Sequence, residues 1–406
     1  MMEIPKFTTN VREVGGSADD PLSVHVEKRH GNLRLAAVTA FLAVIATAAS
    51  IRAADDAGDA DDADDTGVAA LAKELAARGW IVFAGHPAEI DGGQLIQNMQ
   101  ERGQLDLYLV RPDGSGLRNI TNTAELHEVG GRFSPDGKRL LYHQLPRETV
   151  INHDQWGAPG RLVIADADGS NPVVHGAPGE FPWASMSPDG KQIACLYRQQ
   201  GKMRIFDLAT KQLVRELPNQ GIFQQLHWSP DGKQLAGTAL IVGRPWNVVT
   251  VDLETRKFSL LTRAFSCTPD WFQGDSQQVI FSNRNPDLFR RQYNEYGFTI
   301  LMRATADGSR RDLIYANAWK HCYYGCTSPD DRYVVFADDP TDEIVVGELR
   351  VLRLADAPII PPALKSLKRL YPNAKEGPVF DLKLSNGVPL RGFEPHWTYS
   401  EIGARP

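Results

Sequence analysis

The segment 132–142 reads RFSPDGKRLLY, and its central phrase returns three more times along the chain. The further copies are SMSPDGKQIACLY at 185–197, HWSPDGKQLAGT at 227–238 and CTSPDDRYVVFAD at 326–338. A degraded copy, DWFQGDSQQVIFSN at 270–283, keeps the aromatic residue and the following strand but lacks Ser-Pro. A phrase that recurs in this way indicates a repeat architecture, so it decides the fold before any single residue is considered.

Each copy of the phrase predicts a tight β-hairpin. Proline fixes φ for the turn, Asp-Gly supplies the positive φ that the turn requires, and alternating hydrophobic residues begin the returning strand. A second hairpin accompanies each phrase, for example RLVIADADGSNPVV at 161–174 and NVVTVDLETRKFSLLT at 247–262. Two hairpins form a four-stranded antiparallel sheet, and sheets repeated every 40 to 45 residues or so are typical of propeller blades.

The ends of the repeat region complete the blade count. GWIVFAG at 79–85 reads as a second strand without a first, and FEPHWTY at 393–399 reads as a first strand without a second. Pairing these two strands closes the ring and removes exposed edges. We therefore predict an all-β fold over 69–406, a six-bladed β-propeller of four-stranded antiparallel blades, closed by pairing of the N- and C-terminal strands.

Three stretches do not fit the regular blade length. Segments 143–160 and 283–297 contain the residues in excess of a blade, so we expect long loops there. The Pro-rich stretch 352–378 predicts an irregular last blade.

The SPDG phrases and the FEPHW variant resemble the repeats of the TolB-like propeller family, over most of residues 79–399. Members of that family include the periplasmic Tol-system protein and the propeller domains of some prolyl-type peptidases. The resemblance implies the fold, whereas function has to be argued from a site because propellers host many unrelated activities.

The region before the propeller predicts export from the cytoplasm. An apolar run within 35–54 follows basic residues and ends in small ones, which is typical of a signal peptide or an N-terminal anchor. A polar lead precedes it at 1–34, and an acidic, disordered linker is expected at 55–68. We expect a periplasmic or secreted protein, or one that residues 35–54 attach to the membrane facing outside the cytoplasm. Cleavage and the true start codon stay open.

Composition excludes several classes of function. The chain has 406 residues and a formal net charge of -6, so it lacks the basic footprint of a nucleic-acid binder. Four cysteines are too few for a disulfide scaffold, and Cys322 and Cys326, on one strand, would lie roughly 13 Å apart. The sequence contains no G-x-S-x-G, P-loop, H-E-x-x-H or dinucleotide-binding motif. We expect a monomeric propeller.

The strand that leads into each SPDG phrase should be the innermost of its blade, with alternate residues facing the central channel. The residue directly before Ser is expected to pack between blades, and the one before that to face the axis. The axis positions are then Arg132, Ser185, His227, Asp270, Cys326 and His396. The next layer, two residues further back, is Gly130, Trp183, Gln225, Thr268, Tyr324 and Glu394.

Polar members of these layers, with one histidine farther along an inner strand, are the candidate channel and ligand-binding residues. They are Arg132, Gln225, His227, Asp270, His321, Tyr324, Glu394 and His396. His227, His396 and Asp270 could hold a divalent metal if their ligand atoms converged at about 2.0–2.3 Å from one point. The alternative is a polar, water-filled channel without a cofactor.

Two functions from different classes follow. The leading interpretation is an exported, non-catalytic binding or scaffold protein that recognises a protein, peptide or carbohydrate at the propeller rim or channel. The alternative is a channel-centred enzyme, such as a metal-dependent lyase of the oligogalacturonate type or a hydrolase. Some TolB-like propellers resemble oligogalacturonate lyases, whose inner-strand histidines bind a metal, and HCYYGCTSPDD at 321–331 with His227 and His396 suits that idea best. No residue is assigned a catalytic role.

Overall fold

A computed structural model describes residues 65–96, 101–151, 160–241, 246–262, 265–275, 277–284, 299–317, 320–339 and 346–403. The predicted lead, signal segment and most of the acidic linker, together 1–64, lie outside these ranges. Residues 65–68, which we expected in the linker, begin helix α2 (Asp65–Leu75) instead. Within the described ranges, no helix combines the length and the apolar character needed to span a bilayer.

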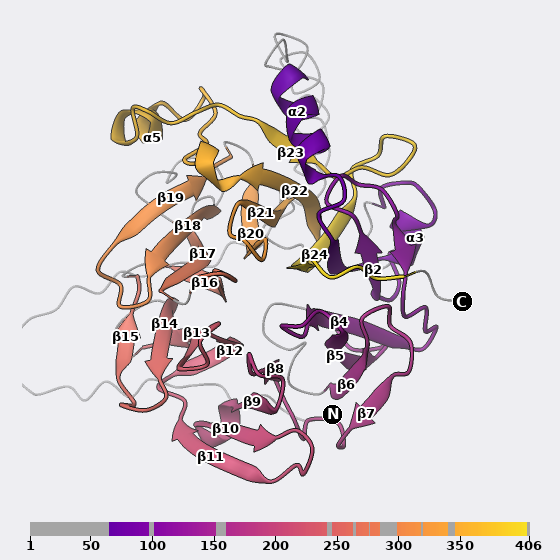
Figure 1. The fold of residues 1–406 in the computed structure, drawn as a ribbon, viewed down its shortest axis with the longest axis vertical. Helices are drawn as coiled ribbons and strands as arrows, with labels where there is room; N and C mark the ends of the chain where they lie inside the picture. The colour runs from indigo at the N-terminus through magenta and orange to yellow at the C-terminus, as the bar shows by residue number, and fades with distance from the viewer. Residues whose placement is uncertain are drawn as a thin grey trace, which may run out of the picture. The chain divides into compact units, whose positions relative to one another are not determined.

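Four separate antiparallel sheets of four strands stand around a central axis (Figure 1). The first contains β4 (Leu126–Phe133), β5 (Arg139–Pro146), β6 (Arg161–Asp166) and β7 (Val173–His175). The second contains β8 (Ser185–Met186), β9 (Gln192–Tyr197), β10 (Lys202–Asp207) and β11 (Leu213–Pro218). The third contains β12 (Ile222–Trp228), β13 (Gln234–Leu240), β14 (Trp246–Asp252) and β15 (Phe258–Leu260). The fourth contains β16 (Ser266–Trp271), β17 (Gln278–Arg284), β18 (Thr299–Thr305) and β19 (Arg311–Tyr315).

The remaining eight strands form one sheet in two four-stranded runs. One run is β20 (His321–Thr327), β21 (Tyr333–Asp339), β22 (Gly347–Arg353) and β23 (Val379–Asp381). The other is β24 (Arg391–Thr398), β1 (Trp80–Gly85), β2 (Asp106–Val110) and β3 (Arg118–Asn119). The pairs Gly347↔Gly392 and Glu348↔Arg391 join the two runs. The prediction of an all-β propeller with four-stranded antiparallel blades is confirmed.

The last strand of the chain pairs with the first, as predicted. In the antiparallel ladder of β24 and β1, Trp80 lies opposite Thr398 and Ile81 lies opposite Trp397. Trp397 is fully buried, its ring lies 6.0 Å from that of Tyr333, and its Nε1 donates to the Arg78 carbonyl at 2.8 Å. One side chain thus ties the C-terminal strand to the chain segment that leads into β1.

Short helices and irregular segments complete the fold. They are α3 (Pro87–Ile90), α5 (Lys365–Leu370) and two 3-10 turns at Arg198–Gln200 and Leu354–Asp356. The second turn and α5 lie between β22 and β23, where the sequence predicted an irregular blade. Long loops were expected at 143–160 and 283–297. Both begin later than predicted, because β5 continues to Pro146 and β17 continues to Arg284. Most of the two segments, 152–159 and 285–297, lies outside the described residues.

The SPDG phrases act as turns through a repeated set of side-chain hydrogen bonds. The Ser134 hydroxyl donates to Asp136 Oδ1 at 2.6 Å and accepts from the Arg139 backbone N–H at 2.9 Å, while Gly137 has a φ of 64°. Equivalent Ser-to-Asp bonds occur at Ser187, Ser229 and Ser328. In the last copy Asp331 replaces the glycine at a φ of 54°, a conformation that aspartate tolerates better than most residues.

Candidate functional site

Five of the six inner strands, all but β8, contain a β-bulge at which one residue has a left-handed conformation. In β4, for example, Val129 pairs with His143 and Arg132 pairs with Leu141, so one extra residue is inserted. At β8 the left-handed residue, Trp183, lies two residues before the strand. The left-handed residues are Gly130 (φ 67°), Trp183 (53°), Gln225 (54°), Thr268 (50°), Tyr324 (55°) and Glu394 (50°). Glycine is the usual residue at such a bulge, and a left-handed side chain costs about 1–2 kcal/mol. Five of the twelve non-glycine residues with a positive φ in the described part of the chain belong to this set, which makes the channel a place to look for function.

These left-handed residues line a narrow chamber on the axis, with a volume of about 40 Å³. Such a volume holds a few water molecules at most. Six of the eight candidates from the sequence line it: Arg132, Gln225, His227, Asp270, Tyr324 and Glu394. The sequence analysis assumed a regular strand and did not foresee the bulge.

A wide chamber of about 620 Å³ lies on the side of the SPDG turns. That volume is in the range of small-molecule sites. Its rim includes the four turn prolines and two half-buried aromatic residues, Pro135, Pro188, Pro230, Pro329, Trp228 and Tyr399. Arg132, His227 and Asp270 line both chambers, so they form the floor that separates them, and His396 lines the wide one.

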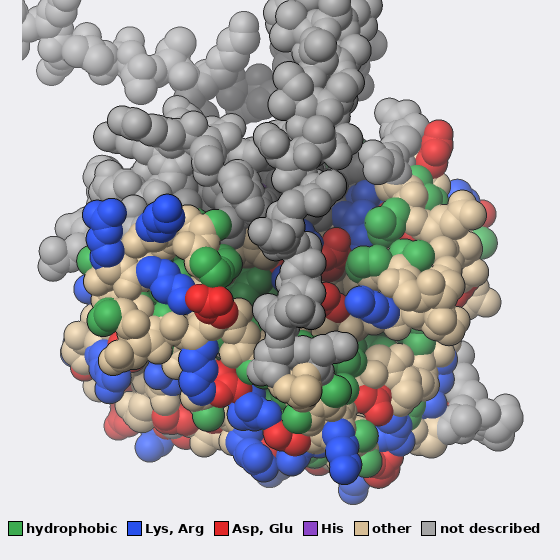
Figure 2. All heavy atoms as spheres, turned by 90° about the horizontal axis from the view of Figure 1, so that it is seen from above, with side chains coloured by type: hydrophobic (Ala, Val, Ile, Leu, Met, Phe, Trp, Pro, Cys, Tyr) green, Lys and Arg blue, Asp and Glu red, His purple; other side chains and the backbone are tan. Residues whose placement is uncertain are grey.

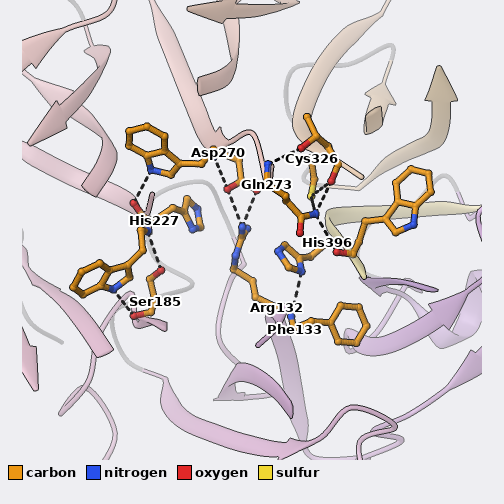
Figure 3. A network of polar contacts seen from close by, with 12 residues as sticks. Arg132, Phe133, Ser185, His227, Asp270, Gln273, Cys326 and His396 are labelled. Carbon is orange, nitrogen blue, oxygen red and sulfur yellow. Dashed lines mark hydrogen bonds and ion pairs between the residues drawn. The ribbon is translucent and has the colours of Figure 1, made fainter. Parts of the chain in front are cut away.

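An ion pair crosses the channel at this floor (Figure 3). Arg132 Nη2 donates to both carboxylate oxygens of Asp270 at 2.8 Å. The backbone N–H of Trp271 also donates to Asp270 Oδ1, at 2.8 Å. Burial lowers the pKa of Arg132, but the acidic groups around it, Asp270 first, together outweigh burial and the net shift is upward. The guanidinium stays charged and is held by the inner strand of another blade.

Two histidines flank the ion pair and are neutral. Burial, reinforced by the positive charge of Arg132, holds the pKa of both His227 and His396 well below the usual range. The Phe133 backbone N–H donates to His396 Nδ1 at 3.2 Å. His396 therefore carries its ring proton on Nε2.

Glu394 is a second acid near Arg132, in the wall of the narrow chamber, and its environment favours the protonated form. Burial raises its pKa to about 8, with Asp270 adding to the shift and Arg132 opposing it. Its Oε2 is buried without a hydrogen-bond partner among the described residues. At neutral pH the charges of the floor therefore reduce to the balanced pair of Arg132 and Asp270.

The raised pKa of Glu394 predicts a pH-dependent stability. The folded pKa of about 8 exceeds the ordinary 4.5, so the folded state binds the proton more tightly and stability is lost as pH rises from about 4.5 to 8. We expect Glu394→Gln to become more stable than the parent across this window, by up to roughly 1 kcal/mol per pH unit. Urea unfolding at pH 5, 6.5 and 8 measures the free energy of unfolding of the parent and of Glu394→Gln. Replacement of an exposed acid, Glu254→Gln, is the control. A stability difference for Glu394→Gln that does not change with pH would contradict the assignment.

The predicted metal site does not form among these residues. In the part of the chain that the structure describes, no group of three or more His, Cys, Asp or Glu side chains is arranged to hold a metal ion. Asp270 already binds a guanidinium through both oxygens, and His396 Nδ1 accepts a backbone N–H. Some of the ligand atoms of the expected metal site, formed by His227, His396 and Asp270, therefore already bind other groups of the protein.

His321, chosen as a channel candidate farther along an inner strand, lies apart from the other candidates. It is fully buried at the start of β20, and its Nδ1 accepts from the Thr299 backbone N–H at 3.2 Å. Its ring also stacks near Tyr323, with centroids 6.1 Å apart. The residue lies in the contact between β18 and β20, and it lines neither chamber.

Gln273 is a site residue that the sequence analysis missed. It stands in the degraded copy where the others have proline, and its Nε2 donates to the Thr327 carbonyl at 2.5 Å and the Trp397 carbonyl at 3.0 Å. Its side chain therefore links β16 to β20 and β24 beside the wide chamber. The substitution of proline by glutamine was the available signal.

The aromatic residues directly before the Ser positions pack between blades, as predicted. Trp228 Nε1 donates to the Ser185 carbonyl and Trp271 Nε1 to the His227 carbonyl, each at 3.0 Å. Each indole thus bonds the axis residue of the preceding blade. These bonds fix the spacing of the axis residues around the channel.

No protein-family model matches the chain. Among solved structures it is similar to TolB from Acinetobacter baumannii, with a TM-score of 0.49, 16% identity, and coverage of 68% of this chain and 61% of that one. The chain thus spans about three fifths of that TolB. It is also similar to a putative TolB from Agrobacterium tumefaciens (TM-score 0.44, 18% identity, 68% and 85% covered) and to an oligogalacturonate lyase in complex with manganese (0.36, 16%, 55% and 61%). In the arrangement of its blades, the chain is similar to TolB proteins.

Proposed function

We propose that this protein is an exported, non-catalytic binding module whose wide chamber receives its partner. One observation carries the proposal: a cavity of about 620 Å³ whose lining combines prolines and aromatic side chains with hydroxyl, amide, imidazole and charged groups. A cavity of this size with aromatic side chains and convergent polar groups is what small-molecule and peptide sites have in common. The proposed partner is a protein, peptide or carbohydrate group that enters from the side of the SPDG turns.

We also propose a number of blades and an oligomeric state. We count the eight-stranded sheet as two blades, which makes a closed ring of six, and we propose that the ring is monomeric. Basic and acidic side chains are interspersed on the face drawn in Figure 2, in keeping with a partner other than nucleic acid. Export is proposed from the apolar run at 35–54.

Binding at the wide chamber can be followed through tryptophan indole signals. A panel of acetylated tripeptides and short oligosaccharides is titrated into labelled protein. We expect saturable shifts of the Trp228 and Trp271 indole N–H resonances with at least one probe, while Trp246, on β14 and outside both chambers, stays unchanged. The probe should be recovered intact. Probes that shift neither indole, or that are converted to product, would overturn the proposal.

The lyase alternative is tested separately. It needs a metal held by His227, His396 and Asp270, and Asp270 is bound to Arg132 through both oxygens. We expect equilibrium dialysis with Mn²⁺ to give the same weak uptake for the parent and for His227→Ala with His396→Ala. Stoichiometric uptake that the two substitutions abolish would favour the lyase.

A further inference from the structure

The wide chamber has no net charge with which to hold an ion. Among the described residues that line it, only Arg132 and Asp270 are formally charged, and they neutralise each other at 2.8 Å. His227 and His396 are neutral, because burial and the charge of Arg132 hold their pKa values well below the usual range. A charged group that entered the chamber would lose its hydration without gaining a free counter-charge. The chamber therefore favours an uncharged ligand.

Two side chains at the floor have hydrogen-bond donors left over. The Phe133 backbone N–H donates to Nδ1 of His396, so the Nε2–H of the same ring is a donor. Both bonds from Arg132 to Asp270 come from Nη2, and Nη1 has no hydrogen-bond partner in the described part of the chain. An uncharged ligand that meets the floor must therefore supply acceptors.

Gln273 adds an acceptor beside these donors. Its Nε2 donates to the Thr327 and Trp397 carbonyls, whereas its Oε1 has no hydrogen-bond partner among the described residues. Figure 3 shows Gln273, His396 and Arg132 gathered in one part of the channel. Because each of the three side chains is already held by another bond to the protein, its orientation is fixed before a ligand arrives, which lowers the entropy cost of binding.

Hydroxyl groups match this mixture of donors and acceptor, because a single hydroxyl oxygen both donates and accepts. Two adjacent hydroxyls can accept from His396 and Arg132 and donate to Gln273. A peptide carries its N–H and C=O on opposite sides of the peptide plane and matches neighbouring groups less well. The lining also contains two half-buried aromatic side chains, Trp228 and Tyr399, and the C–H face of a sugar ring is apolar enough to pack against such rings.

We infer that the wide chamber binds a neutral carbohydrate, whose hydroxyl groups bond the Nε2–H of His396, Nη1 of Arg132 and Oε1 of Gln273. This inference rests on the proposed binding function and narrows its partner to one chemical class. A sugar acid fits less well, because its carboxylate meets no free positive charge in the chamber.

The first test varies the ligand and leaves the protein unchanged. Methyl glycosides of glucose, galactose, mannose and N-acetylglucosamine are titrated, and the Trp228 indole N–H shift gives their affinities. We expect at least one to bind saturably, and the uronate of the same sugar to bind more weakly by about fivefold or more. Deoxy forms of the bound glycoside, each without one hydroxyl, should include two neighbouring positions at which affinity falls about fivefold, the loss of roughly one hydrogen bond.

The second test varies the protein. His396→Leu removes the Nε2–H donor and should weaken binding of the same glycoside about fivefold. His396→Gln should retain more affinity, because its amide can accept from Phe133 and still donate to the ligand. His175→Leu, on β7 and outside both chambers, is the matched control and should bind as the parent does. Circular dichroism establishes that each variant is folded.

The outcomes separate this inference from the binding function. If acetylated peptides shift Trp228 and no glycoside does, or if the uronate binds more tightly than its neutral sugar, the carbohydrate inference is overturned and the chamber stays a binding site. Deoxy glycosides that all bind as tightly as the parent sugar would also overturn it, whether or not the variants fold. If no probe of any class shifts Trp228, the binding function itself fails.

Discussion

Replacing Trp397 by alanine is expected to destabilise the protein by about 3–5 kcal/mol, the range for truncating a fully buried tryptophan. The indole is buried, lies against Tyr333 and bonds the Arg78 carbonyl, so the change leaves a cavity and an unpaired carbonyl where β24 meets β1. Urea unfolding followed by circular dichroism measures the loss.

A tryptophan outside this closure provides the control. Trp246 is half-buried at the start of β14, so Trp246→Ala should cost less than half as much. If Trp397→Ala stays within about 1 kcal/mol of the parent, the joining of the chain ends does not stabilise the fold as described.

Replacing Arg132 by methionine is expected to cost about 2–3 kcal/mol. The change leaves the mostly buried Asp270 carboxylate without its cation, and a stranded buried charge costs about 3–5 kcal/mol, reduced here by the 24% exposure of Arg132. Arg204→Met removes a similar bond, from Nε to Glu216 at 2.8 Å, but the acceptor carboxylate is 35% exposed there, against 10% for Asp270. Exposed pairs contribute about 0–1 kcal/mol. Equal losses for the two variants in urea unfolding would contradict the partly buried setting of the channel pair.

Much of the architecture could be predicted because it depends on residues that are close together in the sequence. The Ser-Pro-Asp-Gly turns need only residues within the phrase, as the bonds of Ser134 to Asp136 and Arg139 illustrate. The axis positions follow by counting back from each turn, and this rule selects both Arg132 and Asp270 from the sequence. Pairing of the chain ends followed from two half blades that lacked partners.

The rest depends on contacts between distant residues. Trp183 and the bulge residues Thr268 and Tyr324 have left-handed conformations that local preferences argue against, so the surrounding structure imposes them. The spacing of residues along the sequence could not show that Asp270 binds Arg132 across the channel. This contact occupies both carboxylate oxygens that a metal would need. His321 shares the inner-strand pattern, yet it contacts Thr299 of the neighbouring strand β18 and not the channel.

The most direct test of the account is a double-mutant cycle on Arg132→Met and Asp270→Asn, because the two residues come from different sheets and meet only if the inner strands surround one channel. Unfolding free energies of the parent, the two single variants and the double variant give the coupling free energy between the two side chains. We expect about 1–3 kcal/mol, with the double variant less destabilised than the sum of the singles. Additivity to within about 0.5 kcal/mol would contradict the contact, and with it the floor of the proposed binding chamber.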